Sequence, residues 1–288
     1  NTMIRFEKEL TAKPSDMVLF VGDVTSKMAC SIVAKKLNTP VAHVEAGIRS
    51  NDLSMPEEIN RMVTDAISDY FFTTSEKANE NLRKAGANEE RIFFVGNTMI
   101  DTLLKQMPHL QQPPFWDRFG LKEKQYFVMT LHRPANVDQD QHLLSLIEEI
   151  ILVSRGLPLI FPVHPRTAQI ISRISIDAEN LHLVDPLSYL EFNYLVRHAK
   201  AVITDSGGIT EETTVMGVPC MTLRDNTERP ETCTIGTNKL LGTHPKALKP
   251  AMDALFNDQC RTGGNPDLWD GKAAGRIINR LIEIGGKV

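Results

Sequence analysis

The sequence is poor in cysteine, has no excess of positive charge and contains no long hydrophobic run. Only four of its 288 residues are cysteines. Their spacing fits neither a zinc site nor a disulfide framework, which favours a reduced, cytoplasmic compartment and no metal. The formal net charge of −4 gives no general attraction to nucleic acid or to an anionic membrane, so any phosphate must be held by a local site. No segment reads as a membrane span or a signal peptide.

Short apolar runs alternate with amphipathic stretches along most of the chain. We expect strands at residues 17–22, 41–45, 70–73, 92–96, 126–131, 159–163, 181–185, 201–205, 220–223 and 239–241. Helices fit between these strands, for example at 26–36, 57–68 and 76–85. Strands that are apolar throughout and separated by helices predict an α/β fold with parallel sheets covered on both faces, in Rossmann-like layers.

A polar stretch with three prolines, residues 108–124, interrupts this alternation and predicts a linker between two domains. We expect an amino-terminal Rossmann-like domain at 1–107 and a carboxy-terminal one at 125–268. The final helix, within 269–288, is too apolar to stand free and is expected to pack across the domains.

Acidic residues follow the strands of the expected amino-terminal sheet. Asp23 follows the first strand, Glu45 ends the second, and Glu57 opens the next helix. Carboxylates in one cleft raise one another's proton affinity, which makes them general acids and bases near neutral pH. As alternatives, Asp23 fits a helix N-cap and Glu57 a favourable first-turn acid. Glu45 has the weakest structural alternative, because an acid directly after a buried strand is costly without a role.

The segment 205–212, with the sequence DSGGITEE, joins a strand to a helix. Gly207 and Gly208 let the backbone approach a ligand closely, and the helix N-terminus that follows offers N–H groups to a phosphate. Glu212 lies about one turn further on, where a carboxylate can accept from sugar hydroxyls. The alternative is an ordinary strand-to-helix turn with Ser206 as the N-cap.

Basic residues follow three other strands of the carboxy-terminal part. His132-Arg133 and His164-Pro165-Arg166 each follow a strand, where they could clamp a diphosphate. The charged loop 225–231, which contains Arg229, is equally consistent with a binding site and with a solvated loop. No set of His, Cys and Asp residues has the spacing of metal ligands.

Together these stretches resemble the non-hydrolysing UDP-N-acetylglucosamine 2-epimerases. The matching segments stand in family order and cover nearly the whole chain: KPSDMVLFVGDVTS, HVEAGIRS, MPEEINRMVTD, RIFFVGNTMIDTL, LHRPANVD, PVHPR, DSGGITEE, TERPETCTIGTNKLLGT and LWDGKAAGRI. The resemblance implies a GT-B-like fold, with the active site in the cleft between two Rossmann-like domains, and a homodimer.

The same resemblance implies the reaction and the roles of the residues. C2 of UDP-N-acetylglucosamine would be inverted to give UDP-N-acetylmannosamine for surface polysaccharides, by elimination of UDP and re-addition to a glucal intermediate, with no cofactor. The implied catalytic residues are Asp23, Glu45, Glu57 and His132. The implied UDP-binding residues are Ser206, Gly207, Gly208, Glu212 and Arg229. Arg133 and His164 match positions near a second, regulatory nucleotide-sugar site.

Three alternatives to this reading stay open. Nothing here matches the strand and the G-T-R-P-E-type turn with which family members open, so we expect the amino-terminal domain to be incomplete at its start. An inactive nucleotide-sugar-binding fragment is therefore one alternative. A hydrolysing epimerase is another, although that group has a different, Gly- and Asp-rich stretch in place of HVEAGIRS and MPEEINR. A glycosyltransferase of the same architecture would have little use for three acids at strand ends.

Overall fold

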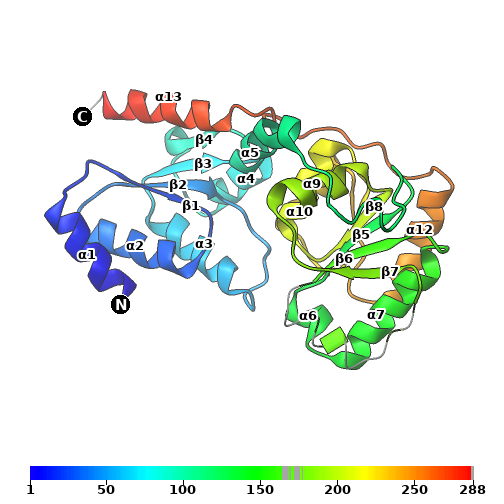
Figure 1. The fold of residues 1–288 in the computed structure, drawn as a ribbon. Helices are drawn as coiled ribbons and strands as arrows, with labels where there is room; N and C mark the ends of the chain where they lie inside the picture. Colours follow the sequence, from blue (N-terminus) through cyan, green and yellow to red (C-terminus); the bar gives the residue numbers. More distant parts are fainter. Residues whose placement is uncertain (164–167, 169, 172–175, 177, 287–288) are drawn as a thin grey trace. The chain divides into compact units, whose positions relative to one another are not determined.

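The chain folds around two separate parallel β-sheets, one of four strands and one of six (Figure 1). The computed structural model describes residues 1–163, 168, 170, 171, 176 and 178–286. It divides into two compact units, Asn1–Thr102 with Asp267–Val288, and Leu103–Pro266. The predicted α/β class with two parallel sheets is confirmed.

The first unit contains the four-stranded sheet, in the order β1-β2-β3-β4. Its strands are β1 (Val18–Val21), β2 (Val41–Ala46), β3 (Tyr70–Thr73) and β4 (Ile92–Phe94). Its helices are α1 (Thr2–Ala12), α2 (Thr25–Lys36), α3 (Pro56–Ile67), α4 (Glu76–Lys84) and α13 (Ala273–Gly285), with the 3-10 turn η1 (Glu89–Arg91). Helix α5 (Thr98–Gln106) runs across the boundary between the units.

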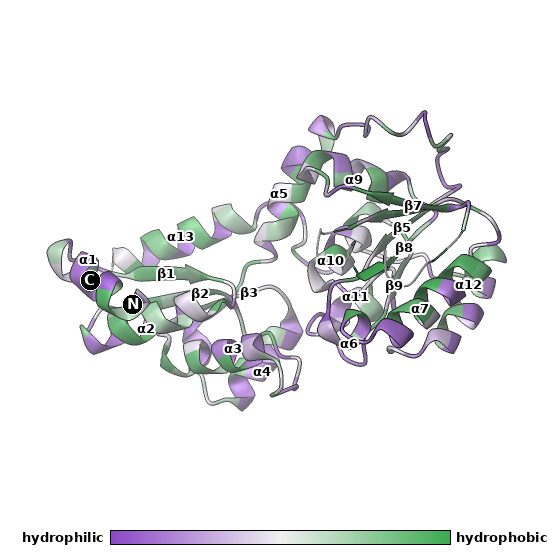
Figure 2. Cartoon of the chain, turned by 60° about the horizontal axis from the view of Figure 1, so that its bottom comes forward, coloured by the Kyte–Doolittle hydropathy of each residue, from purple (hydrophilic) through white to green (hydrophobic). Residues whose placement is uncertain are grey.

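Side chains of β2 alternate between the two faces of this sheet, as the period of a strand requires. Val41 packs with α1 and α2 on one face, while Ala42 and Val44 pack with Ile277 of α13 on the other. Figure 2 shows α13 with green and purple residues along its length, in keeping with a helix that buries one side only. Because both faces of the sheet are covered, β2 is apolar at four of its six positions, the exceptions being His43 and Glu45.

The second unit contains the six-stranded sheet, in the order β10-β9-β8-β5-β6-β7. Its strands are β5 (Phe127–Thr130), β6 (Leu159–Pro162), β7 (Leu181–Val184), β8 (Ala201–Thr204), β9 (Cys220–Thr222) and β10 (Asn238–Leu240). Its helices are α6 (Pro134–Val137), α7 (Asp140–Val153), α9 (Tyr189–His198), α10 (Gly207–Met216), α11 (Pro230–Thr234) and α12 (Leu248–Phe256), with the 3-10 turns η2 (Met107–His109) and η3 (Pro245–Ala247).

The strand order of the second sheet creates a topological switch point. From β5 the chain adds β6 and β7 on one side, and it then returns to add β8, β9 and β10 on the other. The residues that follow β5 and β8 therefore leave the sheet side by side, with Thr130 paired to Thr204. In doubly wound sheets, ligands bind beyond the carboxyl ends of the strands at such a point.

The contacts of the expected linker and of the final helix are as follows. Phe115, Trp116 and Phe119, in the expected linker, pack against the core of the second unit, and the Trp116 ring meets the Tyr126 ring edge-on at 5.4 Å. These aromatic side chains have apolar surface to bury, so the proline-rich stretch belongs to a domain surface. The final helix, which we expected to lie across the domains, contributes Ile277 to the core of the first unit.

No helix in the part of the chain that the structure describes is long and apolar enough to cross a membrane. All four cysteines lie within that part and are free thiols.

A carboxylate from α5 holds the start of α13. Asp101 accepts hydrogen bonds from the backbone N–H groups of Ala273, at 3.0 Å, and Ala274, at 2.7 Å. The first N–H groups of a helix have no partner within the helix, so this acid serves as a cap supplied from elsewhere in the chain.

We expect Asp101→Ala to lower the free energy of unfolding by about 1 kcal/mol, the usual cost of losing a helix cap. Urea denaturation followed by circular dichroism measures the change. Asp267→Ala, which removes an exposed acid near the same helix, is the control and should leave stability within about 0.5 kcal/mol. Equal effects of the two substitutions would contradict the cap.

Candidate active site

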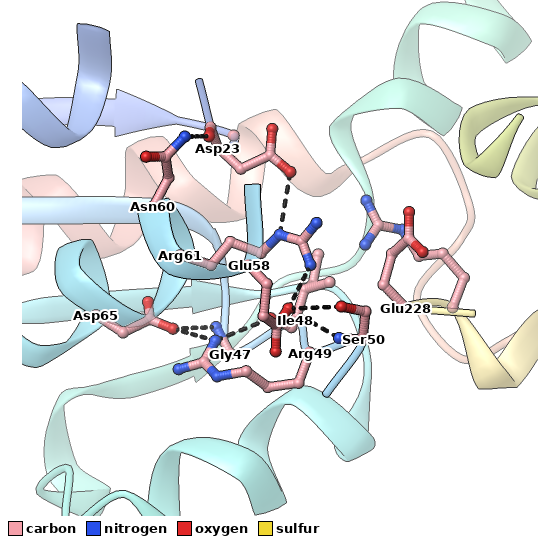
Figure 3. Close-up of polar contacts among 12 residues, drawn as sticks. Asp23, Gly47, Ile48, Arg49, Ser50, Glu58, Asn60, Arg61, Asp65 and Glu228 are labelled. Atoms are coloured by element: carbon pink, nitrogen blue, oxygen red, sulfur yellow. Dashed lines mark hydrogen bonds and ion pairs between the residues drawn. The ribbon is translucent and has the colours of Figure 1, made fainter. Parts of the chain in front are cut away.

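Helix α3 presents a buried face that is polar instead of apolar. Its buried residues are Glu58, Asn60, Arg61, Thr64 and Asp65. Such groups are stable inside a protein only when each is paired. Figure 3 shows partners of Glu58, Asn60, Arg61 and Asp65 in the turns that follow β1 and β2. This helix therefore fixes the segments in which the sequence placed its candidate acids.

Asp23 follows β1 and is held by α3 at two points. Arg61 Nε donates to Asp23 Oδ2 at 3.0 Å, and the Asn60 amide donates to the Asp23 carbonyl at 2.8 Å. The side chain keeps 35% of its surface exposed, whereas that of Arg61 keeps 4%. The N-cap of α2 is Val24, and no side chain caps it. The alternative role of Asp23 as a helix cap is therefore wrong.

Glu45 lies in a β-bulge at the end of β2. Its φ is +68°, and the register with β3 shifts between Val44 and Ala46. The left-handed region costs a non-glycine residue roughly 1 kcal/mol or more, so the surrounding contacts must enforce it. Glu45 Oε2 lies 3.9 Å from the point where a side chain on Gly22 would begin. The Glu45 carboxylate is thus beside the turn that carries Asp23.

The adjacent Glu57 and Glu58 have different surroundings. Glu57 is exposed in the first turn of α3. Glu58 is buried and accepts from the backbone N–H groups of Ser50, at 2.9 Å, and Asn51, at 3.1 Å, and from Arg61 Nη1 at 2.9 Å. Glu58 thus anchors the loop before α3, and Glu57 is left to face solvent. Sequence reasoning missed Glu58, and its i, i+3 spacing to Arg61 is the one signal that pointed to it.

In the second unit, Asp205, which directly follows β8, binds residues that follow the neighbouring strand β5 at the switch point. The buried Asp205 carboxylate accepts from the backbone N–H groups of His132, at 3.0 Å, and Arg133, at 2.9 Å, and from the Asn136 amide at 3.0 Å. It also lies 2.8 Å from His132 Nδ1. Burial alone would raise the pKa of Asp205, but these hydrogen bonds hold it below its usual value. The His132 side chain, 58% exposed, is therefore anchored through Nδ1.

Helix α10 begins directly after Asp205. Ser206 is at the N-cap position, but its side chain makes no cap hydrogen bond, so the structure gives no support to the purely structural alternative. A side chain at Gly207 would begin 2.7 Å from Glu228 Oε1, so it would displace that carboxylate from its present position. The backbone N–H groups of Gly207 and Gly208 lie at the positive end of a helix of ten residues.

Glu212 lies further along α10 and is mostly buried. Tyr189 Oη donates to Glu212 Oε1 at 2.8 Å. Burial raises the pKa of Glu212, and the bonds from Tyr189 and Asn193 only partly oppose the rise.

Two buried arginine–glutamate pairs lie beside the start of α10. Arg224 Nη2 donates to Glu228 Oε2 at 2.6 Å, and Arg229 Nε donates to Glu211 Oε1 at 2.5 Å. Within the described residues, Arg224 Nη1 is buried without a hydrogen-bond partner, and it lies 3.4 Å from the position of a side chain on Gly207. Sequence reasoning named Arg229 but missed Arg224, because an arginine two residues after a buried strand looks like any loop cation.

The regulatory-site prediction concerned Arg133 and His164. Arg133 Nε donates to the Asp205 carbonyl at 2.9 Å, and Arg133 Nη2 lies 4.0 Å from Glu228 Oε1. His164 lies outside the described residues. No group of three or more His, Cys, Asp or Glu side chains in the described ranges is arranged to hold a metal ion. The roles of these residues, and of the other predicted site residues, stay predictions.

Known proteins match this chain over nearly its whole length. A sequence profile of the family described as UDP-N-acetylglucosamine 2-epimerase matches residues 1–282. The chain belongs to the UDP-N-acetylglucosamine 2-epimerase family. The UDP-N-acetylglucosamine 2-epimerase of Methanocaldococcus jannaschii is 39% identical over 98% of this chain and 79% of its own length. The resemblance seen in the sequence motifs is thereby confirmed.

Members of this epimerase family resemble the chain in structure as well. A crystal structure of the M. jannaschii UDP-GlcNAc 2-epimerase in complex with UDP-GlcNAc and UDP matches with a TM-score of 0.86 at 38% identity, over 98% of this chain and 80% of that one. This match confirms the predicted GT-B-like fold class. A relative from Pseudomonas aeruginosa, 36% identical over 98% of this chain and 79% of its own length, is a UDP-2,3-diacetamido-2,3-dideoxy-D-glucuronate 2-epimerase. Epimerases of this kind thus include enzymes for more than one UDP-sugar.

The Glu228–Arg224 pair should make stability depend on pH. Burial opposes the charge of Glu228, but the hydrogen bond and the charge of Arg224 lower its pKa from 4.5 to about 2. A carboxyl whose pKa is depressed in the folded state stabilises the fold above its unfolded pKa, and this contribution is lost as the pH falls through the folded pKa.

We therefore expect Glu228→Gln to lower the free energy of unfolding by about 2–3 kcal/mol at pH 6. The gap to the unmodified chain should close as the pH falls from about 4.5 toward 2. Urea denaturation at a series of pH values measures it, with the exposed Glu90→Gln as the control. A gap that stays constant down to pH 2 would rule out the pair as the source.

Proposed function

We propose that this chain interconverts UDP-N-acetylglucosamine and UDP-N-acetylmannosamine by elimination and re-addition of UDP. The observation that carries the proposal is that the Glu45 carboxylate, at the end of β2, lies beside the turn after the neighbouring parallel strand β1 that carries Asp23, in a chain of this family. The turns that hold them are fixed by buried contacts to α3. Carboxylates at fixed positions are what proton transfer at a carbon atom requires.

In the first step, a carboxylate among Asp23, Glu45 and Glu57 takes the proton from C2 of the sugar. The electron pair of the C2–H bond forms the C1=C2 double bond, and the C1–O bond breaks with its pair leaving on UDP. In the second step, a UDP oxygen adds to C1, and another carboxyl group delivers a proton to the opposite face of C2. Because the proton returns on the other face, two acid–base groups are needed, which fits several carboxylates at one sheet edge.

The second unit supplies groups suited to UDP. The backbone N–H groups at the start of α10 and Arg224 Nη1 favour the diphosphate, which gains charge as it leaves. His132, anchored on Asp205 through Nδ1, points its other ring nitrogen away from that anchor, and the protonated ring can donate to a phosphate oxygen. Glu212, already accepting from Tyr189, has a carboxylate for the ribose hydroxyls. Arg229 reinforces this region through Glu211.

The reaction is tested by proton NMR of UDP-N-acetylglucosamine in deuterated water with the purified chain. We expect deuterium at C2 and a UDP-N-acetylmannosamine signal. Glu45→Gln should slow both by about 10² to 10⁴, the usual share of acid–base catalysis. The exposed Glu90→Gln should not. Free N-acetylmannosamine with UDP would support the hydrolysing alternative, and UDP binding without any exchange would support an inactive binding protein.

Nucleotide binding is tested separately by calorimetry with UDP. Glu212→Gln should weaken binding about 10- to 100-fold, because it removes a charged acceptor. Glu148→Gln, which changes an exposed acid in α7 of the same unit, is the matched control and should bind as the unmodified chain does. Unchanged affinity in Glu212→Gln would contradict the ribose assignment.

A further inference from the structure

His43 is buried in the middle of β2 and has no place in the mechanism above. Its side chain is fully inaccessible, although a histidine in a sheet core must satisfy two ring nitrogens. Nδ1 lies 2.6 Å from Asp65 Oδ1, and Nε2 lies 3.2 Å from the Gly22 carbonyl oxygen. A carbonyl and a carboxylate both accept, so a ring protonated on both nitrogens donates to both.

Asp65 extends this contact to the next turn. Its Oδ2 accepts from the backbone N–H of Gly47 at 3.1 Å, and Arg49 Nη1 lies 2.6 Å from the same oxygen. Burial alone would raise the pKa of Asp65, but His43 and Arg49 hold it below the usual value, so the carboxylate is charged. The pair therefore reaches from Gly22 to Gly47.

The two glycines stand immediately beside the candidate acids. The Gly22 carbonyl belongs to the peptide that joins Gly22 to Asp23, and Gly47 lies two residues after Glu45. A side chain on Gly47 would begin 2.3 Å from the Ala78 carbonyl oxygen, and the Asn81 amide donates to the Gly47 carbonyl at 2.9 Å. Gly47 is thus held on one side by α4 and on the other by Asp65, while Glu45, in the bulge at the end of β2, takes a left-handed conformation.

We propose that the buried His43–Asp65 pair is a positioning element for proton transfer, which holds the turn of Asp23 and the turn of Glu45 at a fixed separation. The inference rests on the proposed function, because it assigns the two carboxylates to the same reaction. His43 and Asp65 touch neither sugar nor nucleotide in this scheme. Their loss should therefore change the rate of the chemical step more than substrate binding.

Two nearly isosteric substitutions separate the two contacts of His43. The amide nitrogen of asparagine falls near the position of Nδ1, so His43→Asn keeps a donor to Asp65 and loses the contact to Gly22. The amide nitrogen of glutamine falls near Nε2, so His43→Gln keeps a donor to Gly22 and loses the contact to Asp65. Ile100→Ala, in the helix α5 that follows the edge strand β4, removes a fully buried side chain of the same unit and controls for general destabilisation.

We expect each His43 variant to lower kcat for C2 deuterium exchange about 10- to 100-fold, the cost of a small misplacement of reacting groups. KM and the Kd for UDP should stay within about twofold, which marks an effect on the transition state alone. Ile100→Ala should keep kcat near that of the unmodified chain at temperatures well below its Tm.

Hydrogen exchange read by mass spectrometry gives a readout that does not need turnover. His43→Gln should speed exchange in residues 44–50, where the Gly47 N–H is held by Asp65, and His43→Asn should speed it mainly in residues 20–25. Unchanged kcat and exchange in both variants would overturn the inference. The inference would also be overturned if the His43 variants lost kcat and UDP affinity only in proportion to their fall in Tm, as the destabilised Ile100→Ala variant does. If the unmodified chain exchanges no deuterium at C2 of the sugar, the proposed function is wrong instead. The backbone amide exchange of the two variants would then still show whether the His43–Asp65 pair holds the turns.

Discussion

The burial of charge on α3 is the constraint on which the first unit depends. An arginine and two carboxylates, Arg61, Glu58 and Asp65, are each almost inaccessible to solvent. Leaving any one of them without its partner would cost several kcal/mol, so the turns after β1 and β2 must take the one arrangement that pairs them all. The same contacts determine where Asp23 and Glu45 lie. Stability of the fold and geometry of the site are therefore set by one network.

The second unit solves a similar problem with a similar pair. Asp65 and Asp205 are both buried carboxylates next to a histidine, and both accept from backbone N–H groups of a turn after a parallel strand. The difference lies in the histidine. The His43 ring is enclosed and contacts protein at both nitrogens, whereas His132 is more than half exposed. A histidine–aspartate pair thus links two turns inside the first unit, whereas in the second unit it holds a histidine ring that is exposed to solvent.

Much of this could be read from the sequence, because parallel strands buried on both faces leave a clear apolar signal. All ten expected strands occur within a few residues of their predicted positions. The acids Asp23 and Glu45 were found from their places after strands. Glu58, Arg61, Arg224 and the His43–Asp65 pair were not, because a buried charge looks like a solvated one until its partner is known. A partner of Arg61 and one of Asp65 lie more than twenty residues away in the sequence. The packing of 108–124 was missed for a related reason, since three prolines before the aromatic residues made the stretch look like a linker.

The cap that Asp101 places on α13 has a consequence for the order in which the chain can fold. The first unit is discontinuous, formed by Asn1–Thr102 and Asp267–Val288, whereas the second unit is one continuous segment. On the ribosome, the sheet face that includes Val44 and Phe72 must wait for Ile277, while the second unit can close its core as soon as it emerges. Contacts of such long sequence separation form late. Residues synthesised after the second unit therefore complete a sheet that was synthesised before it.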